Sequence, residues 1–326
     1  MVTPAPRVAA SACSRARNPL GSCTLCEQAC PRAAIELAAG SAPRIATEAC
    51  NGCGACAAAC PAGALDPLPL PEPQGPDWRL ACSGALPGRA NIGCLNALGL
   101  EQLAAAWLAG VRRILAAPRD CGRCPRQGAP DFTRTLARFN ALLRSRRLET
   151  IAFEEQPPTR GLFGPKLAPV APDRGRRHLL ARLPAGTSRD EEEPPGALGR
   201  LLAARRRPDA LFPIVPRIDP QACTGCDGCA SVCPTGAIRL DAEPVPRYRI
   251  LPWRCNGCGQ CAALCDARAI EIAFDAPAPA PIALSEFRCE GCGVQAHRPT
   301  ARRAGQRALC AVCAARGHTR PDILVL

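Results

Sequence analysis

The sequence has few aromatic residues and no long apolar run. Phe, Trp and Tyr make up 3% of the 326 residues, which excludes a single large aromatic core. No stretch reaches about 18 uninterrupted apolar residues, so we expect no membrane span. Residues 1–18 contain arginines but no continuous apolar segment, which predicts that no secretory signal is present. A cytoplasmic location is therefore expected.

Motifs typical of common enzyme active sites are also missing. The sequence contains no glycine-rich dinucleotide-binding pattern, no phosphate-binding P-loop and no nucleophile elbow. We therefore expect no independent substrate turnover.

Cysteine, by contrast, is abundant, with 24 residues in the chain. A cytosolic protein keeps its thiols reduced, so this number favours metal ligation over disulfides. Proline and glycine together contribute 36 + 28 = 64 residues, which leaves little material for large cores. Bound clusters would then stabilise small domains.

The formal net charge of +13 resembles that of a nucleic-acid-binding protein. That charge counts every cysteine as neutral, whereas ligating cysteines are thiolates. A four-thiolate iron–sulfur or zinc site carries about −2, so the sites predicted below would remove about 12 positive charges. The loaded protein would be close to neutral, which makes nucleic acid an unexpected partner.

Residues 223–265 contain the pattern CxxCxxCxxxC twice. Two-residue spacings let three sulfurs wrap one corner of a [4Fe–4S] cubane, and the fourth cysteine ligates the neighbouring cluster. Gly225 and Gly228 permit the tight backbone that this requires. The segments 235–240 and 269–274 are expected to be short strands packed over the clusters. We assign one cluster to Cys223, Cys226, Cys229 and Cys265, and the other to Cys255, Cys258, Cys261 and Cys233.

The same pattern recurs twice near the N-terminus. Residues 50–60 contain all four cysteines, whereas the copy that ends at Cys30 lacks its first cysteine. Leu20 stands where the ligand belongs, and Cys13 is the spare cysteine nearby. Asn18, Pro19 and Gly21 favour a turn that returns Cys13 to the site. The alternative is a [3Fe–4S] cluster with three ligands and an idle Cys13. We predict one cluster held by Cys13, Cys23, Cys26 and Cys60, and its neighbour held by Cys50, Cys53, Cys56 and Cys30.

These motifs resemble those of bacterial 2[4Fe–4S] ferredoxins. The resemblance covers roughly residues 214–275, where eight cysteines are in register, and residues 45–66 match again. It implies two ferredoxin-like domains that transfer single electrons.

Residues 76–156 alternate between strand and helix patterns, which predicts a mainly parallel sheet. Expected strands are 77–82, 90–94, 111–117 and 148–153, and expected helices are 98–108 and 131–146. Ligands of such sheets gather at the carboxyl ends of the strands. Four further cysteines follow predicted strand ends and are expected to converge, namely Cys82, Cys94, Cys121 and Cys124.

Three states of that middle site stay open, a [2Fe–2S] cluster, zinc and free thiols. The segments Ala81–Gly84 and Arg119–Cys124 read "ACSG" and "RDCGRC". They resemble segments of the delta subunit of methyl-viologen-reducing hydrogenases, a cluster-bearing electron adaptor. That resemblance favours [2Fe–2S].

The C-terminal cysteines have the spacing of a zinc ribbon, two CxxC knuckles separated by 17 residues. A rubredoxin-like iron site is the alternative. His297 and His318 are interpreted as surface residues, because four thiolates already satisfy zinc. The predicted ligands are Cys289, Cys292, Cys310 and Cys313.

Together these features predict an α+β multidomain protein with two ferredoxin-like 2[4Fe–4S] modules, an intervening small α/β domain and a C-terminal zinc-ribbon-like module. The predicted ranges are 1–70 (ferredoxin-like), 76–156 (α/β), 157–212 (a Pro/Arg-rich, solvated linker with a short helix at 198–207), 213–276 (ferredoxin-like) and 285–326 (zinc-ribbon-like).

The predicted function is iron–sulfur electron transfer, either as a polyferredoxin-like relay or as a ferredoxin-type subunit of an oxidoreductase. Expected partners are redox proteins such as a flavoprotein, hydrogenase or reductase subunit. The alternative is an iron–sulfur/zinc nucleic-acid-binding or regulatory protein, although the scarcity of aromatics argues against base stacking.

Overall fold

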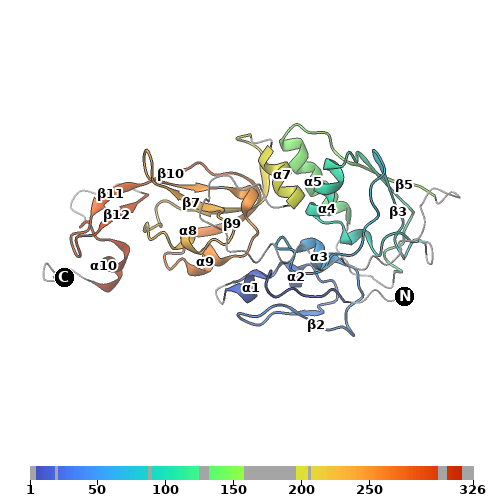
Figure 1. Ribbon diagram of the computed structural model, residues 1–326, viewed down its shortest axis with the longest axis horizontal. Coiled ribbons are helices and arrows are strands. Elements are labelled where there is room, and N and C mark those ends of the chain that lie inside the picture. Colours follow the sequence, from blue (N-terminus) through green and yellow to red (C-terminus); the bar gives the residue numbers. More distant parts are fainter. Residues whose placement is uncertain are drawn as a thin grey trace, which may run out of the picture. The chain divides into compact units, whose positions relative to one another are not determined.

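The computed structural model describes residues 5–18, 21–86, 90–124, 132–157, 196–204, 207–299 and 307–317 (Figure 1). Leu20, His318 and most of the predicted linker lie outside the described residues. The chain forms two compact units. The first comprises Met1–Cys13, Thr24–Ala38 and Ala42–Arg205, and the second comprises Ser14–Cys23, Ala39–Ser41 and Arg206–Leu326. Within the described ranges, no helix has both the length and the apolar character needed to cross a membrane.

The N-terminal part of the first unit consists of very short elements. Helices α2 (Leu25–Gln28) and α3 (Ala55–Ala59) accompany the strand pair β1 (Ile35–Glu36) and β2 (Arg44–Ile45), which is antiparallel. A single antiparallel bridge joins Val8 to Leu65. Its small buried core consists of Cys26, Ile35, Cys56, Ala57 and Leu65.

A three-stranded parallel sheet occupies the rest of the first unit, in the order β3 (Asp77–Leu80), β4 (Arg113–Ala116), β5 (Ala152–Glu155). It is accompanied by helices α4 (Leu100–Leu108) and α5 (Phe132–Ser145) and by the 3-10 helix η1 (Leu95–Ala97). The parallel sheet predicted from strand–helix alternation is confirmed. Its core contains a large apolar cluster that includes Leu80, Ile114 and Phe139.

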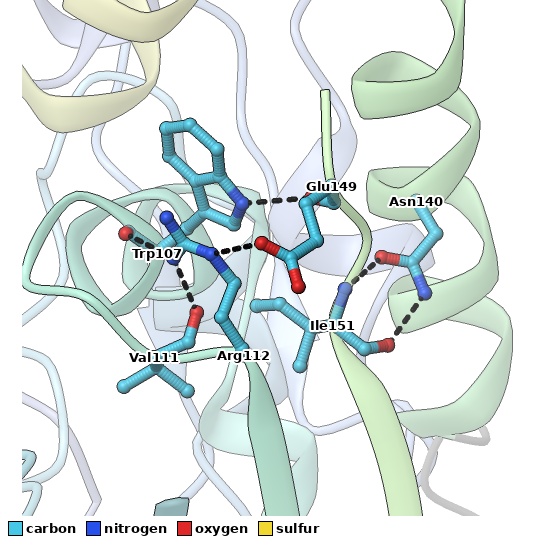
Figure 2. Close-up of polar contacts among 6 residues, drawn as sticks. All are labelled: Trp107, Val111, Arg112, Asn140, Glu149 and Ile151. Atoms are coloured by element: carbon cyan, nitrogen blue, oxygen red, sulfur yellow. Dashed lines mark hydrogen bonds and ion pairs between the residues drawn. The ribbon is translucent and has the colours of Figure 1, made fainter. Parts of the chain in front are cut away.

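Hydrogen bonds from side chains hold residues 149–151, the segment that leads into β5 (Figure 2). Asn140 of α5 donates to the carbonyl of Ile151 at 2.8 Å and accepts from its N–H at 2.9 Å. Beside it, the Trp107 indole donates to the Glu149 carbonyl at 2.9 Å, and the Glu149 carboxylate accepts from Arg112 at 3.0 Å. These bonds hold residues 149–151 in line with the sheet.

The strand predicted at 90–94 does not form. One parallel bridge joins Ile92 to Cys82, and the N–H groups of Asn91 and Ile92 both donate to the Ala81 carbonyl, at 3.0 Å and 3.2 Å. The Asn91 side chain accepts from the Ala81 N–H at 2.8 Å and donates to the Arg79 carbonyl at 2.9 Å. These bonds hold the segment beside the end of β3 without a regular strand ladder.

The helix expected at 198–207 is observed as α7 (Gly196–Ala204), but it is not solvated. Ala197 and Leu201 belong to the buried core of the α/β domain. The Glu101 carboxylate of α4 accepts from the N–H groups of Ala197 at 2.6 Å and Leu198 at 3.1 Å, which caps the start of α7. The predicted solvated linker is therefore wrong for Gly196–Ala204, which packs against the core of the parallel sheet.

The second unit is built around a long antiparallel pair, β6 (Leu211–Ile218) with β9 (Ile270–Pro277). A three-stranded sheet has the order β10 (Ile282–Ala283), β8 (Arg247–Ile250), β7 (Ile238–Asp241). Short helices α8 (Gly228–Val232) and α9 (Gln260–Leu264) carry cysteines, and η2 (Pro252–Arg254) precedes the second motif. The segment of residues 14–23, with α1 (Ser14–Arg17), also belongs here.

The last part of the second unit is a hairpin followed by a helix (red in Figure 1). Strands β11 (Ser285–Arg288) and β12 (Gln295–Arg298) are antiparallel, with Glu286 opposite His297. Helix α10 (Ala311–Arg316) follows. The first CxxC knuckle lies between β11 and β12, and His297 is on β12.

Candidate iron–sulfur and metal sites

One backbone turn is repeated four times, after the last cysteine of each CxxCxxxC run. The residue three positions after that cysteine has a left-handed backbone, with φ of 48° at Ala33, 60° at Gly63, 64° at Gly236 and 49° at Arg268. The next N–H then points back and donates to the cysteine sulfur. These bonds are Ala34 to Cys30 (3.3 Å), Ala64 to Cys60 (3.3 Å), Ala237 to Cys233 (3.2 Å) and Ala269 to Cys265 (3.3 Å).

The ligand loops of the second ferredoxin-like module also depend on left-handed residues. Gly225 (φ 74°) and Asp227 (φ 59°) lie in the first loop, and Gly257 (φ 66°) and Gly259 (φ 74°) lie in the second. Because such angles reverse the chain within one residue, three closely spaced sulfurs can face one point. Asp227 adopts this conformation without being glycine, and two hydrogen bonds to its carboxylate accompany it.

Apolar strands cover these loops as predicted. Ile238 of β7 and Ile270 of β9 pack in one cluster with Cys223 and Cys229. The segments 235–240 and 269–274 therefore supply strands, and they reduce the access of water to the sulfurs.

Buried thiols in both modules carry strongly raised pKa values. Burial raises the pKa of Cys56 to about 12, and the neighbouring charges of Cys53, Cys30 and Cys50 add to the increase. These three are the other members of its predicted cluster. The protonated thiol is therefore favoured, and a thiolate ligand at this position would need the compensating charge of a bound metal ion.

The same relation holds in the second module. Burial raises the pKa of Cys255 to about 12, and the charges of Cys233 and Cys258 raise it further. The pKa of Cys223 is raised by burial first and then by the charges of Cys226 and Cys265. In each case the charge of the fourth cysteine of one motif raises the pKa of a thiol in the other motif.

The N-terminal ligand loop is irregular. Cys13 and Cys26 are buried and Cys23 is half-buried. The Gly21 N–H donates to the Asn18 carbonyl at 2.9 Å, which is the expected turn. Cys23 belongs to the second unit, whereas Cys13, Cys26 and Cys60 belong to the first. The four-cysteine set with Cys13 stays a prediction.

The middle cysteines lie on loops at the carboxyl ends of β3 and β4. The Ser83 N–H and hydroxyl both donate to the Gly93 carbonyl, at 3.3 Å and 2.8 Å, which brings the Cys82 and Cys94 loops together. A Cβ placed on Gly84 would lie 2.9 Å from the Cys124 sulfur. Cys121 is exposed. In the described ranges, these four sulfurs do not form the tight group seen at the C-terminus.

The C-terminal cysteines form such a group. The sulfurs of Cys289, Cys292, Cys310 and Cys313 all lie within 4.8 Å of one another, and no other set of three or more His, Cys, Asp or Glu side chains in the described part of the chain does so. A tetrahedral ion with Zn–S bonds of about 2.3 Å spaces its sulfurs about 3.8 Å apart, and the Cys292 and Cys310 sulfurs lie 3.9 Å apart. The four thiols therefore suit a single ion. A cubane would separate them more, because each sulfur binds a different iron.

Backbone N–H groups donate hydrogen bonds to one of these thiols and lower its pKa. The N–H groups of Cys310 and Gly291 donate to the Cys289 sulfur at 3.2 Å and 3.4 Å. Burial acts to raise the pKa of Cys289, but the N–H donors outweigh it and lower the pKa to about 6. The lowered pKa makes this thiol easier to deprotonate, which metal binding requires, whereas burial raises the pKa of Cys313 in the same group.

His297 is not a surface residue, contrary to the expectation from sequence. Its side chain is 16% exposed, and Nε2 lies 2.9 Å from Oδ1 of Asp227. The same oxygen accepts from the Tyr248 hydroxyl at 2.6 Å. A single histidine between Ala296 and Arg298 gave no local indication of a partner 70 residues away. The signal in the sequence was Asp227 itself, an acidic residue inside a glycine-rich ligand loop.

The model of the 4Fe-4S dicluster domain family matches the chain twice, at residues 21–66 and 222–269. No curated protein matches the chain in sequence. The two matches confirm the resemblance to 2[4Fe–4S] ferredoxins, and the chain carries two ferredoxin-type 4Fe–4S domains. The middle and C-terminal cysteines lie outside both matched ranges. The resemblance of the middle domain to the hydrogenase delta subunit stays a prediction.

Proposed function

With two ferredoxin-type domains as the premise, we propose that the chain relays single electrons through four [4Fe–4S] clusters. It would act as a polyferredoxin-like carrier or as the ferredoxin-type subunit of a larger oxidoreductase. Such clusters accept and release one electron at a time. The observation that carries the proposal is the fourfold turn, in which an N–H donates to the sulfur of Cys30, Cys60, Cys233 and Cys265.

These N–H groups have a defined role in electron transfer. Reduction adds negative charge to the sulfurs, and a fixed backbone donor stabilises that charge. Because the donors are part of tight turns, they do not need to reorient when the charge changes. The apolar cover from Ile238 and Ile270 excludes water and further sets the potential.

The pattern of raised pKa values supports the crossed ligand sets. The charge of Cys30 raises the pKa of Cys56, and the charge of Cys233 raises the pKa of Cys255. Each fourth cysteine would therefore complete the cluster of the neighbouring motif. Two clusters that share such crossed motifs lie within one small domain, which suits transfer between them.

For the remaining eight cysteines we propose two further sites. Zinc fits the C-terminal group, whose sulfurs are close enough for one ion. The middle site would hold [2Fe–2S] or zinc, supported by the convergence of the Cys82, Cys94 and Cys124 loops. All 24 cysteines are then used.

The partners that this function needs are other redox proteins, of the kind represented by flavoproteins, hydrogenases or reductase subunits. The chain would receive electrons from one and deliver them to another, because no substrate motif was found in the sequence.

Anaerobic purification with iron, sulfide and zinc analysis and EPR tests the proposal. Four cubanes and one [2Fe–2S] cluster correspond to about 18 irons per chain, and about 16 irons with two zincs would assign zinc to the middle site. Protein purified under these conditions without reducible [4Fe–4S] signals would overturn the proposed function. Tight, salt-sensitive binding of nucleic acid by the fully loaded protein would show that electron transfer is not its sole function.

A further inference from the structure

The C-terminal hairpin lies directly against a cluster-ligand loop of the second ferredoxin-type domain. A Cβ on Gly225 would lie 2.1 Å from the His297 carbonyl oxygen and 3.1 Å from Cα of Arg298. Only glycine allows β12 to approach so closely. Gly225 is located between Cys223 and Cys226, two predicted ligands of the same cluster.

A polar contact fixes the same approach. Asp227, between Cys226 and Cys229, accepts from Tyr248 of β8 and contacts His297 of β12 through the same oxygen. Tyr248 is 1% exposed, so its hydroxyl has no access to bulk water as an alternative partner. The His297 and Tyr248 rings meet edge to face at 6.1 Å. The ligand loop is therefore held from two sides, and one side is the C-terminal hairpin.

The position of His297 depends in turn on the four-thiol site. The Cys289 N–H donates to the Val294 carbonyl at 2.9 Å, which closes the hairpin next to the first knuckle. Arg298, adjacent to His297, donates to the Leu309 carbonyl at 2.9 Å, next to Cys310 of the second knuckle. Both ends of β12 are thus tied to segments that carry metal ligands. Small modules of this kind generally fold only when the ion is bound.

We propose that zinc bound by Cys289, Cys292, Cys310 and Cys313 holds the C-terminal hairpin against the Cys223–Cys229 loop, with His297 as the positioning residue. We call this arrangement the clamp. This inference rests on the proposed iron–sulfur function and adds a regulatory coupling to it. Occupancy of the zinc site controls the environment of one [4Fe–4S] cluster. When the clamp opens, the Asp227 carboxylate loses the contact with His297 that partly offsets its negative charge, so that charge disfavours reduction of the adjacent cluster more strongly.

The experiment compares full-length, anaerobically loaded protein with three variants. Cys292→Ser removes a zinc ligand, His297→Ala removes the contact to Asp227, and Glu286→Gln changes the exposed residue opposite His297 as a matched control. For each protein we measure zinc and iron content, hydrogen exchange of peptides covering 222–232, and cluster potentials by EPR-monitored titration.

Loss of one zinc per chain is expected for Cys292→Ser, with iron unchanged. Exchange of the 222–232 peptides should increase, and the potential of one of the four clusters should fall. His297→Ala should cause the same two changes with zinc retained, and Glu286→Gln should cause neither. His297→Gln, whose amide can donate to Asp227, should restore the potential at least partly, which a purely structural role would not predict.

Two results would overturn the clamp. One is loss of zinc without any change in exchange or potential, and the other is an unchanged potential in His297→Ala. If Cys292→Ser does not fold, His297→Ala alone decides. Iron in place of zinc at this site would overturn the assignment of the ion. Wild-type protein without [4Fe–4S] signals would instead refute the proposed function, so the two failures are distinguishable.

Discussion

The middle α/β domain and the two ferredoxin-type domains differ in what fills their interiors. The sheet of the α/β domain is covered by a continuous apolar core that includes Leu80, Ile114 and Phe139. The buried core of the first ferredoxin-type domain is much smaller and contains two predicted ligands, Cys26 and Cys56. Because those thiols are buried beside other thiols in a small core, we expect their domain to need metal for stability. The core around the parallel sheet also contains one predicted ligand, Cys82, but among many aliphatic and aromatic side chains, so we expect it to depend less on metal.

Removal of iron tests this comparison, and it should cause the largest change in hydrogen-exchange protection. When the full chain is refolded without iron or sulfide, residues 21–66 and 222–269 should lose their hydrogen-exchange protection. Peptides from β3, β4 and α5 should keep most of theirs, since Leu80, Ile114 and Phe139 remain packed. The comparison would be wrong if all three regions lost protection together, or if the ferredoxin-type domains kept theirs.

A second prediction concerns the irregular ligand loop. Cys13 precedes Cys23 by ten positions, whereas Cys223 precedes Cys226 by three. If each supplies the first ligand of its cluster, Cys13→Ala and Cys223→Ala should each remove about four irons or convert one cluster to a [3Fe–4S] form with about one iron less. Iron analysis and EPR of the oxidised protein measure both outcomes.

Leu20→Ala serves as the control for that experiment, because Leu20 occupies the position that a regular motif gives to cysteine. It should leave the iron content unchanged. An unchanged iron content and EPR spectrum in Cys13→Ala would show that the site has three cysteine ligands, so the two domains would differ in cluster type as well as in loop length.

The sequence predicted the parts of the molecule that follow local rules. Cysteine spacing identified both ferredoxin-type domains, and the alternation of apolar patterns identified the parallel sheet. It did not predict that the Asn91 side chain bonds to the backbone of Arg79 and Ala81, or that His297 contacts Asp227. The partners of Asn91 are 10 and 12 positions away and that of His297 is 70 positions away, and no local pattern marks either residue as buried or paired.

The α/β domain should respond to loss of a single polar side chain without losing clusters. Asn140→Ala removes both hydrogen bonds to Ile151 that Figure 2 shows. Each bond contributes about 0.5–1.5 kcal/mol, so the free energy of unfolding of this domain should fall by about 1–3 kcal/mol. Urea denaturation followed by tryptophan fluorescence measures this change, and iron content should stay at the wild-type value.

Gln156→Ala is the matched control for Asn140→Ala. Its side chain makes one exposed contact, to Glu154 at 3.5 Å, so the change in unfolding free energy should be much smaller. Equal effects of the two substitutions would show that the contacts to Ile151 do not stabilise the domain.

The smallest effect is expected at the surface of the same sheet. Two hydrogen bonds from Arg113, at 2.9 Å and 2.8 Å, lower the pKa of the Asp77 carboxyl. A lowered pKa means that the ion pair stabilises the folded state above the unfolded pKa of about 3.9, and that this stabilisation is lost as the pH falls through the lower folded value.

Asp77→Asn should therefore lower the Tm of the α/β domain slightly at pH 7, and the difference from wild type should disappear as the pH falls below about 3.9. The effect is small because water surrounds the pair and screens it. Measured in the iron-free full-length chain, the Tm reports this domain without interference from acid-labile clusters. Glu72→Gln, at an exposed position before β3, should show no such pH dependence. A constant difference across this pH range would mean that Asp77 acts through packing rather than through its charge.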